Sequence, residues 1–408
     1  MHSQLKNKRQ TFLPQETPCV PIQTLGQDGP LIQMDNYPLW IFFRPYNLAP
    51  RLTLLYGRTP RLRRMQETHP HVGHAAPFDG QALGLARSAI REGRMGMTDT
   101  MKVGWAGIGK MGAPMSRRVL EHGHSLTVYE PLPENRAFIV GLGANVAHSL
   151  ADLAASSDVI VLTIPNDAIL RQLTLVPDAL GDVMQAGQIL VEMSTVSPEI
   201  SAEIAAVLEP KGVAYIRAPV SGSTVTAASG GLSVMVSGQE DAYRRITPLL
   251  ESVSAKQFYV GQGEEARYLK LVVNAMVGAT AALLGEALTL GLKGNLSVET
   301  MLSVICESAV ASPLIAYKRD LLVKRNFDPA FSVSQMMKDF DLILDTAKSD
   351  HVPMYLASMI RQQYEAAFAE GLAEKDFFVL FEQYERLAGI APEMRPDTEP
   401  KIGTCKTG

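Results

Sequence analysis

The stretch of sequence that decides the fold runs from Lys102 to Pro131 and reads "KVGWAGIGKMGAPMSRRVLEHGHSLTVYEP". It has the pattern of a buried strand, a glycine-rich turn, a helix and a second strand. The turn carries G-x-G-x-x-G at Gly107, Gly109 and Gly112. The first glycine permits the tight turn, the second lets a pyrophosphate approach the backbone, and the third lets the helix pack closely on the strand. Amides at the helix N-terminus then face the phosphates.

A lone carboxylate follows the second strand of this stretch. Glu130 lies 21 residues after Gly109, where a carboxylate accepts hydrogen bonds from both ribose hydroxyls of a dinucleotide. The position favours NAD over NADP, because a 2′-phosphate would face a like charge. The nearby Arg136 carries the opposite charge, so NADP remains an alternative. The alternative is that Glu130 only caps its strand. The residues predicted to bind the cofactor here are Gly107, Ile108, Gly109, Lys110, Met111, Gly112 and Glu130.

Strand-like runs recur downstream at the spacing of an α/β fold. They occupy 158–165, 188–195, 213–220, 232–238 and 257–261. Helical patterns or turns separate most of them, which predicts a doubly wound, mainly parallel Rossmann sheet covered on both faces. Because the strand ends of such a sheet point toward the ligand crevice, we expect four further residues beside the cofactor, namely Pro165, Asn166, Ser194 and Thr195.

The chain after Gly263 shows only helical patterns. A long helix is expected from Glu264 to about Gly294, with further helical segments continuing to Gly389. An all-α domain that follows a Rossmann domain must close the crevice for chemistry to happen there. The predicted organisation has four parts. Residues 1–100 form a disordered or non-native leader, and 101–263 form an NAD-binding Rossmann domain. Residues 264–391 form an all-helical substrate and dimerisation domain, and 392–408 form a flexible tail.

Two polar residues stand in the apolar long helix. Lys270 and Asn274 are four apart and share a face. Gly278 and Ala282 continue this stripe and are expected to leave room for close approach to the first domain. A lysine and an asparagine in so apolar a helix are costly unless they serve a partner. The alternative is that Lys270 reaches solvent near the helix start while Asn274 bonds to backbone.

Residues 1–94 differ in composition from the rest of the chain. They hold 10 of the 25 prolines and 12 basic residues against 6 acidic ones. Because prolines remove donors and restrict the residue before them, we expect no packed sheet or long helix here, apart from a short apolar patch around Trp40. Three interpretations stay open: a disordered basic leader, an organelle transit peptide, or upstream sequence outside the working protein, since Met95, Met97 and Met101 can each start the chain.

The overall composition is that of a soluble globular protein, with 46% hydrophobic and 20% charged residues. A net charge of -4 gives no reason to expect a nucleic-acid partner. Three scattered cysteines suit a reducing cytoplasm and provide no zinc site. No clustered set of His, Cys or carboxylate ligands appears in the sequence, so no metal is expected. Polar residues within the long apolar run argue for a buried helix and against a membrane span.

Several motifs occur in a characteristic order. They are "GIGKMGAPM" (107–115), "APVSGS" (218–223) with "GGLSVMVSG" (230–238), "KLVVN" (270–274), "MMKDFDLILDTAKSDHVPM" (336–354) and "EGLAEKDF" (370–377). In these motifs the chain resembles the β-hydroxyacid dehydrogenase family, the group of 3-hydroxyisobutyrate dehydrogenase, tartronate semialdehyde reductase and, more remotely, 6-phosphogluconate dehydrogenase. The resemblance covers about residues 101–390.

The resemblance implies a role for each motif. Lys270 is expected to act as general acid/base, taking the proton from the substrate hydroxyl as hydride leaves for the nicotinamide, and Asn274 to orient substrate and lysine. Because a free lysine has a pKa of about 10.4, burial or a nearby positive charge must favour the neutral form. Lys338 is expected to reach across to the nicotinamide or substrate end, while Asp339 supports its helix. The residues expected to hold the substrate carboxylate are Ser221, Gly222 and Ser223.

Two departures from the family pattern bear on the substrate. Arg217 stands where relatives usually carry an acidic residue, and Ser223 replaces the last glycine of the familiar S-G-G. Arg217 either binds a second anionic group or faces outward in a surface pair, and we favour the surface pair.

The expected function is hydride transfer between NAD, with NADP possible, and a small 3-hydroxy acid or its semialdehyde. A homodimer or homotetramer is expected, because the long apolar helix has more face than one small domain can cover. Two alternatives are an imine reductase on the same fold and a non-catalytic dinucleotide-binding relative. Both are expected to lack the lysine, so the presence of Lys270 with Asn274 argues against them.

Overall fold

The computed structural model describes residues 31–33, 39–42, 53–56 and 100–392. Two compact units divide the chain, Met1–Leu83 and Gly84–Gly408. Within the first unit, three short strands pair antiparallel in the order β1-β2-β3, at Leu31–Gln33, Leu39–Phe42 and Thr53–Tyr56.

The expectation of no sheet in the leader is therefore wrong. Pro30 and Pro38 come directly before β1 and β2 in the sequence and do not interrupt them. Proline is compatible with a position at a strand's start, where no ladder hydrogen bond is lost. The other expectations for the leader, and those for the tail after residue 392, fall outside the described residues.

The second unit contains one large sheet. Its strands are β4 Lys102–Ala106, β5 Ser125–Tyr129, β6 Asn145–Val146, β7 Val159–Leu162, β8 Ile189–Glu192, β9 Ala214–Arg217, β10 Val220–Ser221, β11 Leu232–Ser237 and β12 Ser254–Gly261. Each strand-like run of the sequence forms a strand, and 213–220 forms two. The pattern missed β6, because two residues are too short to show an alternation.

The strand order is β6-β5-β4-β7-β8-β9 through the parallel part, and β11, β10 and β12 extend the sheet beyond β9. Parallel pairing holds from β6 to β9, whereas β11 is antiparallel to both β9 and β10. The order reverses between β4 and β7, and in open α/β sheets ligands bind beyond the carboxyl ends of the strands at such a switch point. The predicted doubly wound, mainly parallel sheet is confirmed.

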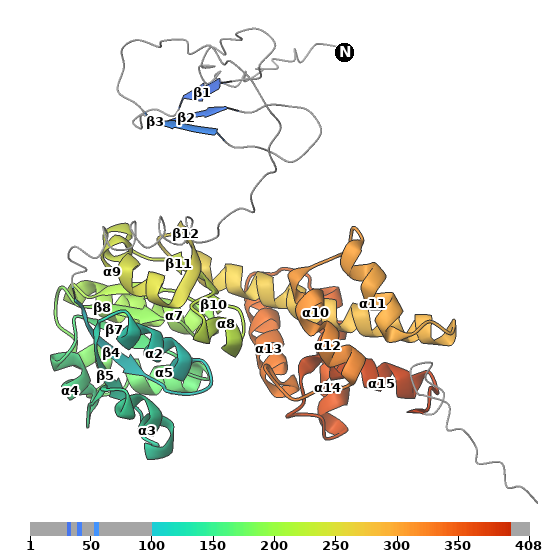
Figure 1. Cartoon of the computed structure of the whole chain (residues 1–408). Helices are drawn as coiled ribbons and strands as arrows, with labels where there is room; N and C mark the ends of the chain where they lie inside the picture. Colours follow the sequence, from blue (N-terminus) through green and yellow to red (C-terminus); the bar gives the residue numbers. More distant parts are fainter. Residues whose placement is uncertain (1–30, 34–38, 43–52, 57–99, 393–408) are drawn as a thin grey trace, which may run out of the picture. The chain divides into compact units, whose positions relative to one another are not determined.

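Helices cover both faces of this sheet (Figure 1). The helices are α2 Gly112–Glu121, α3 Pro133–Gly141, α4 Leu150–Ala155, α5 Asp167–Thr174, α6 Leu180–Val183, α7 Pro198–Leu208 with the 3-10 turn Glu209–Lys211, α8 Thr224–Ala228 and α9 Glu240–Val253. Alternate residues of β7 enter two separate apolar clusters: Val161 packs with Met115 and Leu249, and Ile160 packs with Leu170 and Ile204. This alternation shows why the strands read as continuous apolar runs.

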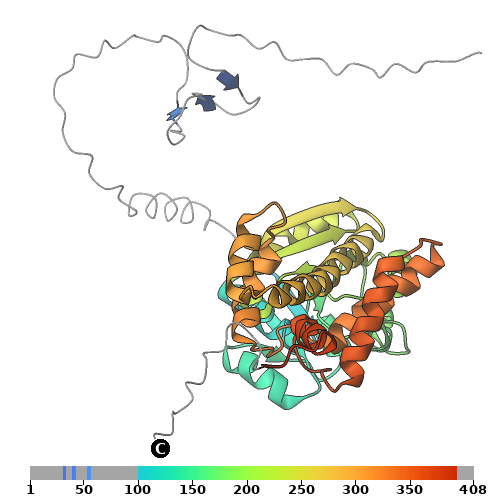
Figure 2. The ribbon, with the colours of Figure 1, turned by 90° about the vertical axis from the view of Figure 1, so that its right-hand side faces the viewer.

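The rest of the described chain is helical. The helices are α10 Glu265–Lys293, α11 Val298–Glu307, α12 Pro313–Lys324, α13 Val333–Ser349, α14 Tyr355–Ala369, the 3-10 turn Phe377–Val379 and α15 Leu380–Leu387. Helix α10 contacts β11 and β12 near its start and then packs against α13, α14 and α15 (Figures 1 and 2). The predicted all-α domain after the sheet is confirmed.

Helix α10 is, among the described residues, long and apolar enough by composition to span a membrane. A core helix passes the same test, and a separate apolar cluster of the helical domain encloses Leu284 and Leu288 of α10. One expectation for α10 is wrong. Gly278 faces Phe340 of α13, whose Cε2 would lie 2.3 Å from an added Cβ. Gly278 therefore allows close approach of α13, not of the sheet.

Candidate active site

The three glycines after β4 occupy three different environments. Gly107 has φ +92°, and an added Cβ would lie 2.3 Å from the Thr163 carbonyl oxygen. At Gly112 it would lie 2.0 Å from the Gly107 carbonyl oxygen, whereas at Gly109 it would meet no atom within 4 Å. The first and third glycines are thus required by close packing, and the second faces open space where a pyrophosphate can approach the backbone.

The start of α2 provides the donors for such a phosphate. Its N-cap, Met111, makes no side-chain cap, and the first turn contains no acidic residue. The first amides of a helix lack intrahelical partners and carry a partial positive charge, so they bind anions. Lys110 beside them is exposed, while Ile108 is buried under the turn. The residues present therefore fit a dinucleotide.

Glu130 is tied to this turn. Its Oε2 accepts from the Ile108 amide at 2.9 Å and its Oε1 from the Leu132 amide at 3.2 Å, and the side chain is buried. Arg136 Nη1 donates to the backbone carbonyl of Glu130 at 2.8 Å. The carboxylate thus joins the end of β5 to the glycine turn and is more than a strand cap. An arginine stands beside it.

The residues that follow β7 and β8 differ in exposure. Pro165 and Asn166 are exposed, and Asn166 caps α5 by accepting from the Ile169 amide at 3.0 Å. Ser194 is buried, and its hydroxyl accepts from the Ile164 amide at 2.7 Å. This hydrogen bond fixes the two strand ends to each other, which makes Ser194 a support of the crevice edge.

A chain of polar contacts joins α10 to this edge through α13. Lys270 Nζ donates to Asn274 Oδ1 at 2.9 Å, and Asn274 Nδ2 donates to Asp339 Oδ2 at 2.5 Å. Lys338 Nζ lies 2.9 Å from Asp339 Oδ1 and donates to the Thr195 carbonyl at 2.8 Å. The structure therefore brings Lys270, Asn274, Lys338 and Thr195 together. The expectation that Asp339 only supports its helix is wrong, because its carboxylate links the two lysines.

This setting changes the proton affinity of Lys270. The pKa of Lys270 is lowered from 10.5 to about 8: burial of the amine is the largest cause, the negative charge of Asp339 raises the pKa, and the positive charge of Lys338 lowers it. The residue as a whole is partly exposed, whereas its amine is surrounded closely enough by protein for burial to dominate the pKa. A substantial neutral fraction of the amine thus exists just above neutral pH.

The serine loop, Ser221 to Ser223, begins at the end of β10, the strand that pairs antiparallel with β11 at one end of the strand order. Ser221 ends β10 and is partly buried, and Gly222 is exposed with φ +147°. Ser223 caps α8: its hydroxyl accepts from the Thr226 amide, and Thr226 Oγ1 accepts from the Ser223 amide at 2.7 Å. The Ser223 hydroxyl is thus engaged locally. Ser221 has no side-chain hydrogen bond to any part of the chain that the structure describes.

Sequence reasoning missed a buried ionic cluster under the start of α10. Arg267 pairs with Glu192 of β8, and Arg217 pairs with Glu264; three of these four residues are fully buried and Glu264 is partly exposed. The Arg217 guanidinium also lies 4.5 Å from the centre of the Tyr215 ring. The expectation of a surface pair at Arg217 is wrong, because the side chain is 3% exposed. The only signal in the sequence was a charged residue inside each of two apolar runs.

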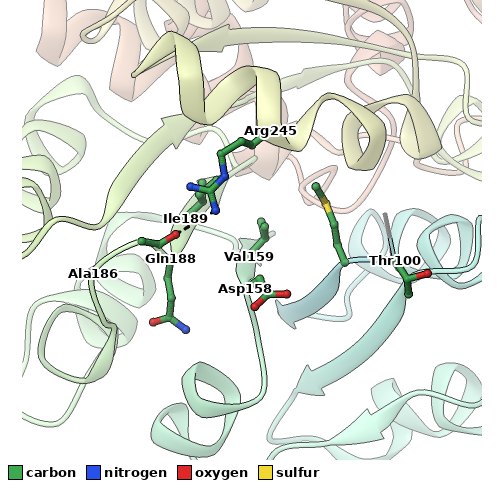
Figure 3. Close-up of a pocket in the computed structure, with 9 residues that line it drawn as sticks. Thr100, Asp158, Val159, Ala186, Gln188, Ile189 and Arg245 are labelled. Atoms are coloured by element: carbon green, nitrogen blue, oxygen red, sulfur yellow. Dashed lines mark hydrogen bonds between the residues drawn. The ribbon is translucent and has the colours of Figure 1, made fainter. Parts of the chain in front are cut away.

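A surface hollow of about 420 Å³ lies at the amino-terminal ends of the central strands, opposite the ends that carry the glycine turn (Figure 3). Its lining includes Thr100, Asp158, Gln188 and Arg245, and Arg245 Nη2 donates to the Gly187 carbonyl at 3.2 Å. Thr100, Asp158 and Gln188 precede β4, β7 and β8, whereas Arg245 lies on α9. Because ligands of this fold bind at the carboxyl ends of the strands, the hollow is separate from the dinucleotide crevice.

Comparison with known proteins identifies the class. Residues 102–261 match the NAD binding domain of 6-phosphogluconate dehydrogenase, and residues 261–384 match the NAD-binding domain of NADP-dependent 3-hydroxyisobutyrate dehydrogenase. The chain is 31% identical to 2-(hydroxymethyl)glutarate dehydrogenase of Eubacterium barkeri over 72% of its own length and 98% of that protein. It is 28% identical to mitochondrial 3-hydroxyisobutyrate dehydrogenase of Mus musculus, covering 71% of this chain and 88% of the relative.

A solved structure agrees with these relatives. The crystal structure of 3-hydroxyisobutyrate dehydrogenase from Salmonella typhimurium matches with a TM-score of 0.63 and 28% identity, covering 69% of this chain and 99% of that one. The chain therefore belongs to the β-hydroxyacid dehydrogenase family, whose members are NAD(P)-dependent hydroxyacid dehydrogenases. Its cofactor is a nicotinamide dinucleotide.

Proposed function

We propose that the protein transfers hydride between a nicotinamide dinucleotide and a small 3-hydroxy monocarboxylic acid or its semialdehyde, with Lys270 as general acid/base. One observation carries the proposal: the Lys270 amine is desolvated, with a pKa of about 8, and is linked through Asn274, Asp339 and Lys338 to the Thr195 carbonyl at the crevice edge. General bases work best when their pKa lies near the operating pH.

The chain's own residues supply the proton transfer and the orientation. The neutral Lys270 amine accepts the proton of the substrate hydroxyl in oxidation, and the ammonium returns it in reduction. Asn274 holds the amine by accepting one of its hydrogens, so the nitrogen lone pair points elsewhere. Lys338 favours the neutral amine by charge repulsion. When bound, the dinucleotide supplies the hydride acceptor or donor.

The substrate class follows from the relatives and from Arg217. A 2-(hydroxymethyl)glutarate dehydrogenase is named for a dicarboxylate, whereas 3-hydroxyisobutyrate carries one carboxylate. Arg217 is buried and paired with Glu264, so its guanidinium is already neutralised. This favours a substrate with one carboxylate, for which Ser221 and Gly222 remain the proposed binding loop.

Glu130 supports NAD as the preferred cofactor. Its carboxylate sits against the glycine turn, where a 2′-phosphate would meet a like charge. Arg136, which donates to the Glu130 carbonyl, is a nearby cation that favours NADP.

Self-association is also proposed. On α10, Met276, Leu283 and Leu290 are exposed at intervals of seven residues. A seven-residue apolar repeat is the spacing with which one helix packs along another, which favours a second copy of this chain as the partner. Light scattering is expected to give a dimer or tetramer, and a monomer at micromolar concentration would contradict it. A cytoplasmic location stays a prediction.

The proposed activity is tested by NAD- and NADP-linked turnover of the full chain on a panel of short 3-hydroxy acids, 3-hydroxy dicarboxylates, semialdehydes and cyclic imines. Turnover of monocarboxylic 3-hydroxy acids that is lost in Lys270→Met is expected. Dinucleotide binding without turnover of any compound would instead establish a non-catalytic relative. Imine reduction that persists in Lys270→Met would establish an imine reductase.

A further inference from the structure

The strongest unexplained feature is the ion pair between Arg267 and Glu192. Both side chains are buried, at 1% and 0% exposed. Arg267 lies in the first turn of α10, and Glu192 ends β8 at the carboxyl edge of the sheet. The pair therefore joins the helix that carries Lys270 to the edge at which the dinucleotide binds.

All three guanidinium nitrogens of Arg267 donate hydrogen bonds within the sheet domain. Nη1 donates to the Ser194 carbonyl at 3.0 Å, Nη2 to the Tyr215 hydroxyl at 3.2 Å, and Nε to Ser201 Oγ at 3.3 Å. A further hydrogen bond holds the same turn, because the Ala266 amide donates to Ser237 Oγ at 3.2 Å. These hydrogen bonds thus attach the first turn of α10 to the sheet.

Stability alone is a weak reason for such a pair. Desolvating two charges costs several kcal/mol each, and well-packed apolar side chains of similar volume often serve stability equally well. A buried pair whose arginine also donates three hydrogen bonds does, however, favour one geometry, since any shift leaves a buried charge unpaired. The feature therefore fits a requirement for a fixed helix position.

Lys270 follows Arg267 by three residues and lies one turn further along α10. On its other side, Asn274 and Asp339 connect it to the helical domain. The lysine is thus held between two anchors, of which only the Arg267 anchor reaches β8 directly. We propose that Arg267, through Glu192, is a positioning residue that holds the Lys270 amine in its desolvated place at the crevice edge.

A direct effect of the Arg267 charge on Lys270 is not part of this proposal. The charges that act on the Lys270 amine are those of Asp339 and Lys338 on α13, and burial is the largest cause of its low pKa. Removal of Arg267 is therefore expected to act by admitting water as the first turn of α10 leaves the sheet. In that case the Lys270 pKa rises toward its ordinary value in Glu192→Gln as well, although loss of a negative charge acting directly would lower it.

The experiment measures the pKa of Lys270 by competitive labelling with an amine-reactive reagent across pH, read by mass spectrometry on the full chain. The variants are Arg267→Met, Glu192→Gln and Arg267→Lys. The control is Arg325→Met, which breaks another ion pair with a buried carboxylate: the partly exposed Arg325 makes two 2.7 Å hydrogen bonds with the buried Glu385 on α15. Wild type and the control are expected to titrate near pH 8.

The proposal expects Arg267→Met and Glu192→Gln to titrate at clearly higher pH, and Arg267→Lys to fall between them and wild type. If Arg267→Met does not fold, the Lys270 titration in Glu192→Gln and Arg267→Lys tests the proposal. Equal Lys270 titration in all variants would overturn the proposal, as would an equal shift in Arg325→Met, since that would reflect general loosening.

Kinetics give a second readout that rests on the proposed function. A displacement of about 1 Å at a reacting group can lower a rate about 100-fold, so kcat is expected to fall 10- to 100-fold in Glu192→Gln with little change in the KM for the dinucleotide. A fall in Tm with kcat unchanged would assign the pair a merely structural role. If wild type turns over no hydroxy acid, the proposed function fails while the labelling experiment still decides the positioning role.

Discussion

The two halves of α10 are held in opposite ways. In the first half, Arg267, Lys270 and Asn274 are polar, and each contacts a partner on another element or on the same turn. In the second half, counted from Gly278 onward, glycines lie under aromatic rings: an added Cβ on Gly278 would lie 2.3 Å from Phe340, and one on Gly285 would lie 2.8 Å from Tyr384. One half is fixed by charge and hydrogen bonds, the other by shape.

This difference separates chemistry from stability along one helix. A buried polar group is costly unless it is paired, so polar residues persist in the first half only together with their partners. Apolar packing requires no particular direction, only matching volume. Changes in the first half are therefore expected to alter rate and pH dependence, and changes in the second half to alter the free energy of unfolding.

Replacement of Lys270 by Met is expected to give the largest effect. Loss of a general acid/base lowers kcat by about 10²- to 10⁴-fold, while the dinucleotide still binds and the Tm does not fall, because a desolvated amine has been removed. Steady-state kinetics and a thermal melt measure both. The control is Lys293→Met at the exposed end of the same helix. A kcat in Lys270→Met equal to that of wild type would contradict the assignment of the chemistry to the first half of α10.

Gly278→Val tests the apolar half. Because the site has no room beside Phe340, overpacking is expected to lower the free energy of unfolding by about 1–3 kcal/mol. Urea denaturation measures this value. Ala206→Val, at an exposed position of α7, is the control and is expected to change it by less than about 0.5 kcal/mol. Equal effects of the two variants would show that α10 is not held by shape there.

Glu130→Ala tests whether the sheet domain selects the cofactor independently of α10. Loss of the carboxylate is expected to raise the KM for NAD about tenfold, the equivalent of about 1.4 kcal/mol, and to leave the KM for NADP nearly unchanged. Arg136→Ala is expected to weaken NADP selectively. Glu134→Ala, an exposed neighbour, is the control. A KM ratio that stays constant in both variants would remove Glu130 and Arg136 from cofactor selection.

The smallest expected effect is a shift of the pH profile. Oxidation requires a neutral Lys270, so kcat is expected to rise with pH through about 8. Lys338 lowers the Lys270 pKa and Asp339 raises it. The rising limb is therefore expected to move to higher pH in Lys338→Met and to lower pH in Asp339→Asn. Shifts of the same sign in both variants would show that the charges on α13 do not set this pKa.

Much of the fold was predictable because its signals are local. The glycine spacing, the apolar runs of the strands and the long helix of α10 each depend on a few neighbouring residues. Lys270 and Asn274 were also found, since a polar pair four apart in an apolar helix is visible in the sequence. Asp339 and Arg217 were misjudged, because nothing near them in the chain shows which element each side chain meets.

The sequence by itself determined the doubly wound sheet, the glycine turn with Glu130, and the lysine on the long helix. Only the tertiary structure decided what surrounds that lysine. Asn274 and Asp339 are 65 residues apart, and Lys338 and Thr195 are 143 apart. Periodicity and turn chemistry act over one or two turns of chain, whereas desolvation and charge pairing depend on whichever groups the complete fold brings within a few ångströms.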